Sequence, residues 1–273
     1  LLAARLARVP RRFAMITGLG YAFLDNGRVR QRLVQRAAVF LYRQALKDAE
    51  GVFFQNPNDQ EEFCQRGLMD TSSRQMRIHG SGVDLTHFQP APVPEQPVFL
   101  LLARLIADKG IREYLAAARQ LKASYPQARF LLAGPMDTNP SAIDKTELEQ
   151  WQAEGTVEYL GNLSDVRQSL AQCSVYVLPS FYREGTPRTV LEAMATGRAI
   201  ITTDAPGCRE TVDNGVNGYL IPPRNTQALA DAMERLIQDP EKRVDMGAES
   251  LRLARERYDV DKVNEVILQG LGL

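Results

Sequence analysis

Apolar and polar positions along the chain follow two different periods. Short apolar runs, such as Val98–Leu102 and Val175–Pro179, are typical of strands that are buried on both faces. The longer stretches between them, such as Ile111–Ser124 and Thr226–Gln238, repeat apolar residues every three or four positions, which is typical of amphipathic helices. Strands and helices that alternate in this way predict an α/β fold with parallel sheets.

The same pattern divides the chain into parts. Up to residue 79 it predicts strands at Arg12–Thr17, Gly51–Asn56 and Met76–His79, and helices at Asn26–Asp48 and Asn58–Arg66, the second with Asn58 as its N-cap. From residue 98 it predicts strands at Val98–Leu102, Arg129–Ala133, Val157–Tyr159, Val175–Pro179, Ala199–Thr203 and Gly218–Ile221, and helices at Ile111–Ser124, Asp144–Glu154, Ser164–Gln172, Arg188–Thr196, Gly207–Asp213, Thr226–Gln238 and Tyr258–Leu271. We therefore expect a smaller α/β unit over residues 1–88, a complete doubly wound parallel-sheet domain over 89–255, and a final helix over 256–273. The proline-rich segment Gly80–Pro97, with Gly82, Val83 and Asp84 at its start, is the predicted linker beside the cleft.

The segment Glu184–Glu192, EGTPRTVLE, follows a predicted strand and carries two carboxylates with seven residues between them. A helix that begins after Pro187 has unpaired backbone N–H groups in its first turn, and such groups bind phosphate. A diphosphate that links a sugar to a ribose would fit between Glu184 and Glu192. We expect donor contacts from the residues between them, namely Gly185, Thr186, Pro187, Arg188 and Thr189.

Two cations, Arg104 and Lys109, follow the predicted strand Val98–Leu102. Taken alone they are equally well explained as surface charges at a strand end, and Glu192 alone is more often part of a solvated helix face. Together with the helix start after Pro187, however, they form one anion site at the carboxyl edge of a parallel sheet, where doubly wound folds bind ligands.

These motifs resemble those of a known enzyme family. ARLIADKG (Ala103–Gly110) and the run EGTPRTVLEAMATGRAIITTDAPGCRETVDNGVNGYLIPPRN resemble the phosphate-binding and donor-site motifs of retaining family 4 glycosyltransferases of the two-Rossmann-domain (GT-B) type. The resemblance covers nearly the whole C-terminal two-thirds of the chain. It implies that Glu184 contacts the donor hexose, that Glu192 holds the ribose hydroxyls, and that Arg104 and Lys109 bind the diphosphate.

The resemblance carries further expectations. Glu184, Arg104 and Lys109 are the candidate catalytic residues. The loop that carries Gly161, Asn162, Leu163 and Val166 is expected to contact the base because it borders the same edge of the sheet. The final helix is expected to cross back onto the first domain. In this family a glycine-rich loop and a histidine complete the site from the first half of the first Rossmann domain. The resemblance implies that residues 1–88 are a partial first Rossmann domain, its second half only, and the first residues here read as the end of a helix. We therefore expect the chain to be N-terminally truncated and, on its own, to bind nucleotide without turnover.

The composition of the chain bears on its cellular compartment and on whether it needs a cofactor. The chain has 273 residues, 44% hydrophobic content and equal numbers of acidic and basic side chains, as expected of a soluble globular protein. The three cysteines and two histidines lack the spacing of disulfides or metal sites, which predicts a cytoplasmic protein without a metal or another cofactor. The pair Asp259 and Asp261 is interpreted as capping the last helix rather than binding metal.

Charge and one short motif bear on the acceptor. Residues 1–49 contain ten Arg and Lys against two Asp, a net charge of +8. The arginines concerned are Arg5, Arg8, Arg11, Arg12, Arg28, Arg30, Arg32 and Arg36. They would suit peripheral contact with an anionic inner membrane or a lipid diphosphate, whereas chance skew in a partial chain and nucleic-acid binding are the alternatives. No nucleic-acid motif supports the last of these.

The segment Ile16–Leu24, ITGLGYAFL, resembles one found in bacterial enzymes that add a sugar to an undecaprenyl-diphosphate-linked saccharide. Its Gly18 and Gly20 lack the third glycine and the acidic residue of a dinucleotide fingerprint, so NAD binding is not expected. The resemblance thus implies a hexosyl- or N-acetylhexosaminyltransferase that takes a nucleotide sugar, expected to be a UDP-sugar, and acts on a lipid-linked saccharide in bacterial polysaccharide biosynthesis. The alternatives are a non-catalytic nucleotide-binding fragment and a sugar-nucleotide epimerase on the same architecture.

Overall fold

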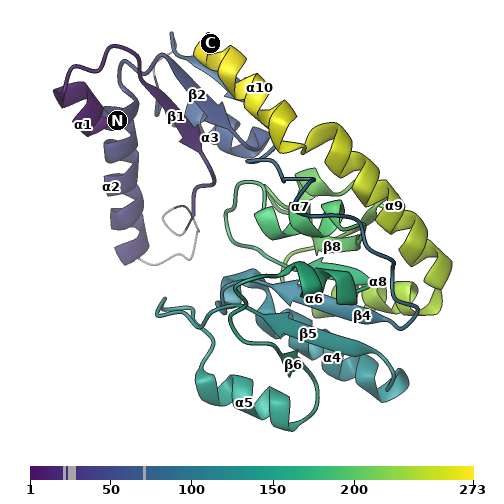
Figure 1. The fold of residues 1–273 in the computed structure, drawn as a ribbon. Helices are drawn as coiled ribbons and strands as arrows, with labels where there is room; N and C mark the ends of the chain where they lie inside the picture. The colour runs from purple at the N-terminus through teal and green to yellow at the C-terminus, as the bar shows by residue number, and fades with distance from the viewer. Residues whose placement is uncertain (21–22, 24–28, 70–71) are drawn as a thin grey trace.

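The computed structural model describes residues 1–20, 23, 29–69 and 72–273, with only the backbone described for residues 29–32. Within these residues the chain forms two parallel sheets, one of three strands and one of six (Figure 1). Both sheets carry helices, which confirms the predicted α/β fold of the two-Rossmann-domain kind.

The elements follow one another in regular strand and helix order. The first sheet contains β1 (Phe13–Ile16), β2 (Gly51–Phe54) and β3 (Arg74–Arg77), accompanied by α1 (Leu2–Leu6), α2 (Val29–Leu46) and α3 (Pro57–Gln65). The second contains β4 (Val98–Leu102), β5 (Arg129–Ala133), β6 (Glu158–Tyr159), β7 (Val175–Leu178), β8 (Ala199–Thr203) and β9 (Gly218–Ile221). Its helices are η2 (Ala107–Lys109, 3₁₀), α4 (Ile111–Ser124), α5 (Lys145–Ala153), α6 (Arg167–Gln172), α7 (Arg188–Ala195), η3 (Arg209–Thr211, 3₁₀) and α8 (Thr226–Gln238). Two long helices, α9 (Pro240–Arg257) and α10 (Val260–Leu271), end the chain.

The six-stranded sheet has the order β6-β5-β4-β7-β8-β9. Successive strands therefore run outward from β4 in one direction and from β7 in the other, so the order reverses between β4 and β7. The central strands are apolar throughout because both of their faces are covered, by α4, α5 and α8 on one side and by α6, α7 and α9 on the other. In doubly wound sheets, ligands bind beyond the carboxyl ends of the strands at this point of reversal.

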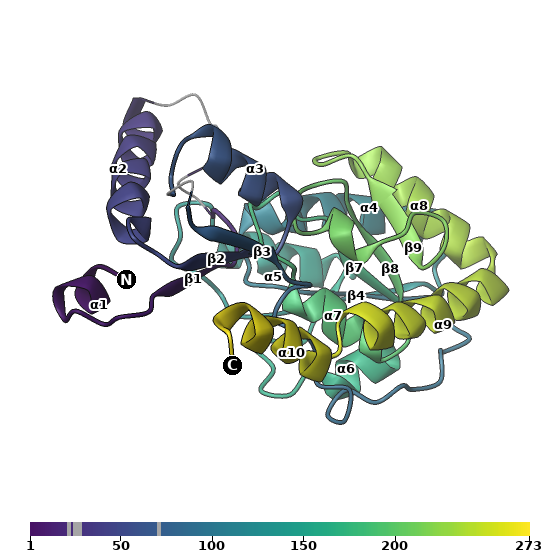
Figure 2. The same ribbon diagram turned by 90° about the horizontal axis from the view of Figure 1, so that it is seen from above.

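The three-stranded sheet has the order β1-β2-β3, and its core includes Val52 and Phe54 of β2 with Phe63 of α3. The end of the chain returns to it: α9 packs on the larger sheet, and α10 continues to the smaller one, as both views show (Figures 1 and 2). The guanidinium of Arg74 in β3 donates a 3.0 Å hydrogen bond to the carbonyl of Gly270 near the end of α10.

Three local predictions were wrong. The N-cap of α3 is Asn56 and not Asn58, because the Asn56 side chain accepts from the amide of Asp59 and Pro57 occupies the first helical position. Residues 207–213 form only the single 3₁₀ turn η3. Helix α9 was not predicted, although Asp239 and Pro240 form an ordinary helix start, with the Asp239 side chain accepting from the amide of Lys242.

Candidate functional site

Two adjoining cavities lie where the order of the strands reverses, at the carboxyl ends of β4 and β7. The smaller, of about 200 Å³, is lined by Leu102, Ala103, Arg104, Ala133, Gly134, Pro135, Asn162, Leu163, Val166 and Thr189. The larger, of about 460 Å³, is lined by Thr17, Gly18, Gly20, Gln55, Ser81, Arg104, Lys109, Tyr182, Arg183, Glu184, Gly185, Thr186, Pro187 and Arg188. Arg104 borders both cavities, so together they form one cleft with an apolar end and a charged end.

At the charged end, Lys109 and Glu184 form an ion pair with 2.6 Å between Nζ and Oε2, and both side chains are only 13% exposed. The hydroxyl of Ser180 donates to Oε1 of Glu184 at 2.6 Å. The close pairing of the β4 and β7 loops depends on Gly110, which has φ +75° and whose missing Cβ would lie 2.2 Å from the carbonyl oxygen of Pro179. Glu184 thus lies in the cleft with both of its carboxylate oxygens engaged.

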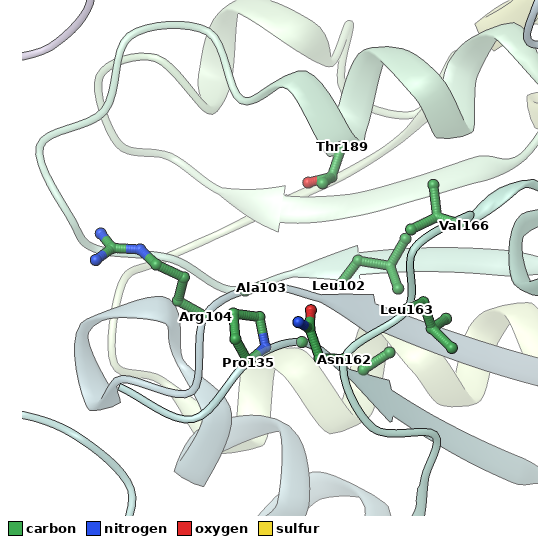
Figure 3. Close-up of a pocket in the computed structure, with 10 residues that line it drawn as sticks. Leu102, Ala103, Arg104, Pro135, Asn162, Leu163, Val166 and Thr189 are labelled. Carbon is green, nitrogen blue, oxygen red and sulfur yellow. The ribbon is translucent and has the colours of Figure 1, made fainter. Parts of the chain in front are cut away.

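Arg104 lies on the first loop of the same sheet edge, where it pairs with Asp137 at 2.9 Å. Its side chain stays 49% exposed, so the guanidinium can reach a ligand in either cavity. Figure 3 shows Arg104 at one end of the smaller cavity and Leu163 and Val166 at the other, with Asn162 between them and Thr189 across from it.

The remaining residue of that loop, Gly161, has a different role from the three that line the cavity. Its carbonyl accepts a 2.9 Å hydrogen bond from the amide of Gly134, which joins the loop after β6 to the end of β5. The loop of Gly161 therefore borders the cavity, as predicted, but Gly161 contributes backbone shape.

Helix α7 begins at Arg188, as predicted, with Pro187 as its N-cap. The amides of Arg188 and Thr189 thus lie in the first turn, where an α-helix offers no acceptor of its own. The Thr189 hydroxyl accepts a 2.6 Å hydrogen bond from the buried hydroxyl of Tyr176. Glu192 lies one turn further along and shares the helix face of Thr189. Burial raises the pKa of Glu192 above its usual value, an effect that nearby Arg188 partly offsets.

The loop of Glu184 is also bound from the first sheet, which the sequence did not reveal. The amide of Gly185 donates to the carbonyl of Thr17 at 2.9 Å, and the amide of Gly20 donates to the carbonyl of Arg183 at 2.9 Å. The amide of Thr186 donates to Oε1 of Gln55 at 3.0 Å. The Thr186 amide, predicted to be open to phosphate, is therefore already occupied.

These contacts also explain why position 18 of the motif ITGLG is a glycine. Gly18 has φ +115°, and a Cβ there would lie 2.5 Å from the amide nitrogen of Gly185. The glycine permits the first sheet to approach the loop of Glu184. Tyr21, Ala22 and Leu24 of the same motif lie outside the described residues.

Residues Gly82, Val83 and Asp84 lie at the linker but line neither of the two cavities. Val83 forms backbone hydrogen bonds with Tyr258 and Val260, at the junction of α9 and α10. Asp84 accepts hydrogen bonds from the Thr86 hydroxyl and from the following amides, which lowers its pKa. The only member of this segment that borders the larger cavity is Ser81, among the residues described.

The basic N-terminal part is engaged in part by contacts within the chain. Arg11 pairs with Glu50 at 2.9 Å, and Arg12 donates to the carbonyl of Asp48 at 3.1 Å. Arg28 lies outside the described residues, as do the side chains of Arg30 and Arg32.

In the part of the chain that the structure covers, no helix is long and apolar enough to cross a membrane. The same residues contain no group of three His, Cys, Asp or Glu side chains placed to hold a metal ion. Asp259 caps α10 by accepting from the amide of Asp261.

Sequence comparison assigns the family. The profile described as "Glycosyl transferases group 1" matches residues 83–252, more than half of the chain. The chain belongs to this family. The matched range includes both loops of the cleft, the loop after β4 with Arg104 and Lys109 and the loop after β7 with Glu184.

The relatives in this family are glycosyltransferases. The chain is 32% identical, over 95% of its length and 69% of the relative's, to the N,N'-diacetylbacillosaminyl-diphospho-undecaprenol alpha-1,3-N-acetylgalactosaminyltransferase of Campylobacter jejuni. It is 31% identical, over 73% of its length, to the putative colanic acid biosynthesis glycosyltransferase WcaL of Escherichia coli, of which it spans half. Among solved structures, Anabaena HepE in complex with UDP-glucose superposes with a TM-score of 0.80 at 25% identity, over 99% of this chain and 74% of that one.

Proposed function

We propose that the cleft binds a UDP-sugar and that the protein transfers its hexose or N-acetylhexosamine to a lipid-linked saccharide with retention at the anomeric carbon. The observation that supports this most directly is the cleft itself, in which Arg104 joins an apolar cavity to one that contains Lys109 and Glu184. The uracil would occupy the apolar cavity against Leu163 and Val166. The diphosphate would lie at Arg104, and the sugar beside Glu184.

Each group has a distinct part in this proposal. The bond between the sugar C1 and the β-phosphate oxygen breaks, a bond from C1 to the acceptor oxygen forms, and the proton of the acceptor hydroxyl passes to the departing diphosphate. The departing diphosphate gains negative charge, which Arg104, Lys109 and the first amides of α7 would stabilise. Glu184 would hold the sugar hydroxyls and Glu192 the ribose hydroxyls. Lys109 is paired with Glu184 before the donor binds, so donor entry would exchange part of that pairing for contacts to phosphate.

The acceptor follows from the relatives and from charge. The Campylobacter jejuni relative is named for transfer to a diphospho-undecaprenol saccharide, an acceptor that carries a diphosphate. We propose an acceptor of the same class, with peripheral contact at the inner face of a membrane through exposed arginines of the N-terminal part such as Arg8. The relatives named here are transferases, so we favour neither an epimerase nor a non-catalytic nucleotide-binding role.

Transfer assays test this proposal. The protein, expressed with any upstream residues that its gene encodes, is incubated with UDP-N-acetylgalactosamine, UDP-N-acetylglucosamine, UDP-glucose or GDP-mannose and a synthetic polyprenyl-diphosphate saccharide, and the lipid product is detected by mass. We expect one UDP-sugar to be consumed and the new glycosidic bond to be α, read from its anomeric NMR coupling. Conversion of a UDP-sugar into its epimer without acceptor would instead support the epimerase.

We also propose that transfer needs no divalent metal, because Arg104, Lys109 and the helix amides supply the positive charge that a metal would otherwise provide. The expected result is an unchanged rate of sugar transfer after dialysis against EDTA. A rate that falls with EDTA and returns with Mn²⁺ would contradict this.

A further inference from the structure

Arg183, which directly precedes Glu184, forms an ion-paired bridge between the two sheets. Its guanidinium Nη2 lies 2.5 Å from Oε2 of Glu62 and 3.3 Å from Oδ1 of Asp59, both on α3. The side chain of Arg183 is 23% exposed, and that of Asp59 is 1% exposed. The bridge therefore lies largely out of water, where an ion pair is screened little by salt.

The bridge is one of a continuous set of contacts along residues 183–186. The carbonyl of Glu184 accepts a 3.4 Å hydrogen bond from the Asn56 side chain, in addition to the bonds from Gly185 to Thr17 and from Thr186 to Gln55. Every one of these partners belongs to the first sheet or its loops. The segment that follows β7 is thus attached, residue by residue, to the opposite half of the molecule.

Stability alone does not account for this arrangement. Burial raises the pKa of Asp59, so its charged form is costly in this position even with Asn56 and Arg183 as partners. The Arg183 Nε is buried and has no hydrogen-bond acceptor among the described residues. Buried ion pairs of this kind contribute little net stability, and their better-attested role is to fix one arrangement among several.

We propose that Arg183 is a positioning residue that holds the backbone at residues 183–184, so that the Glu184 carboxylate meets the donor sugar beside Lys109 and Ser180. This inference rests on the proposed function of Glu184. Arg183 would touch neither the sugar nor the acceptor at the reacting atoms. Its removal leaves Arg104 and the apolar cavity intact, so it affects turnover and not UDP binding.

The test compares Arg183→Met with a matched control, Arg66→Met. Arg66 pairs with the same Glu62, at 2.9 Å, but it lies on the first sheet's side and forms no hydrogen bond or ion pair with the loop of Glu184 among the described residues. Both substitutions remove one partner of Glu62 and preserve an unbranched side chain. A difference between them therefore reports what Arg183 alone provides, namely the attachment of the loop to α3 and the pairing of Asp59.

Two readouts are taken on the full chain. Hydrogen exchange at the amides of Gly185 and Thr186 needs no substrate, and we expect it to accelerate by about tenfold or more in Arg183→Met and to stay unchanged in Arg66→Met. In transfer assays with the active UDP-sugar, we expect kcat to fall by roughly 10- to 100-fold in Arg183→Met, since small misplacement of a reacting group has effects of this size. UDP affinity by calorimetry should change less than about twofold, and Arg183→Lys should recover part of kcat.

Unchanged exchange at these amides would overturn the bridge, whatever the activity of the wild type. Faster exchange with unchanged kcat, or equal losses of kcat and UDP affinity, would overturn the positioning role. If Arg183→Met does not fold, Glu62→Gln is measured in its place. It must show the same result, namely faster exchange and a lower kcat with nearly unchanged UDP affinity. Absence of turnover by the wild type with every donor would count against the proposed function and leave the exchange result to decide the bridge.

Discussion

At the scale of single residues, the cleft contains charged groups under different constraints. Glu184 has a partner at each carboxylate oxygen, whereas burial disfavours the charged form of Glu192 and raises its pKa. A carboxylate kept under such conditions suits a ligand with hydroxyl donors, because ribose hydroxyls would supply the hydrogen bonds that water no longer provides. The charged form of Glu192 is therefore expected to lower the stability of the protein when no ligand is bound.

Replacement of Glu192 by Ala should weaken UDP binding by about 10- to 100-fold, because hydrogen bonds to a charged group contribute roughly 1.5–3 kcal/mol. Binding of inorganic diphosphate, which has no ribose, should be nearly unaffected. Isothermal titration calorimetry with both ligands measures the difference. Equal loss for UDP and diphosphate would remove the ribose assignment.

Glu192→Gln should change how the stability of the ligand-free protein depends on pH. The folded pKa of Glu192 is raised, so the folded state holds its proton more tightly than the unfolded state does. Stability from this group is present at low pH and is lost as pH rises through the folded pKa. We therefore expect the variant to have a higher Tm than the wild type at pH 7, with the difference closing near about pH 4. Glu265→Gln, on an exposed position of α10, is the control, and a lower Tm of Glu192→Gln at pH 7 would contradict the sign.

At the scale of elements, the second sheet was the most predictable part. The strands Val98–Leu102, Arg129–Ala133 and Ala199–Thr203 were predicted to the residue, since each is a short, mainly apolar run of the kind expected for a strand that is buried on both faces. Helix α9 was missed because its exposed face is strongly charged and its start directly follows α8. The positions of Arg104, Lys109 and Glu184 in one cleft follow from parallel strand order.

What sequence reasoning could not supply was the contact between distant segments. Gln55 and Asn56 carry no motif of their own, and the motif that contains Thr17 was related only to the acceptor. Their hydrogen bonds to the loop of Glu184 depend on how the two sheets are placed. The sequence did indicate the general location of these residues, because Thr17 and Gln55 directly follow β1 and β2 at the carboxyl edge of their sheet. That edge predicts a site but not which groups bond to which.

The turn between η2 and α4 offers an element-scale test. Ala at Gly110 must adopt φ +75° with its Cβ 2.2 Å from the Pro179 carbonyl oxygen, so Gly110→Ala should lower the unfolding free energy by roughly 2–4 kcal/mol. Gly155 has φ +67° with nothing within 4 Å of a Cβ, and Gly155→Ala should lose only about 1 kcal/mol. Urea unfolding compares the two variants, and equal losses would show that the contact with Pro179 is relieved by a small shift.

At the scale of the whole molecule, two crossings join the sheets, and they are bonded to one another. The linker passes from the first sheet to the second, and the α9–α10 junction passes back. The amide of Val83 donates to the carbonyl of Tyr258 at 2.7 Å, and the amide of Val260 donates to the carbonyl of Val83 at 3.1 Å. Gly82 permits this approach, because a Cβ there would lie 2.6 Å from Cα of Val260.

Gly82→Ala should therefore loosen the coupling of the two sheets more than the fold of either. We expect urea unfolding followed by far-UV circular dichroism to begin before unfolding followed by the fluorescence of Trp151, the single tryptophan, which lies in the core of the larger sheet. Gly67→Ala, at φ +56° with open space around it, is the control and should keep the two curves in the same relation as the wild type. Coincident curves in Gly82→Ala would mean that the crossings do not carry the coupling.

The attachment of the Glu184 loop to Thr17, Gln55 and the start of α3 has a consequence for recombining this protein with its relatives. A chimera joined at the linker would take the first sheet from one parent and the donor loop from another, and the hydrogen bonds across the cleft would then unite sequences that never folded together. Such hybrids are expected to fold, because each sheet retains its own core, and to lose turnover. Grafts that transfer residues 17–20, 55–62 and 180–188 as one set should keep it, so the unit of exchange is a group of three distant segments and not a domain.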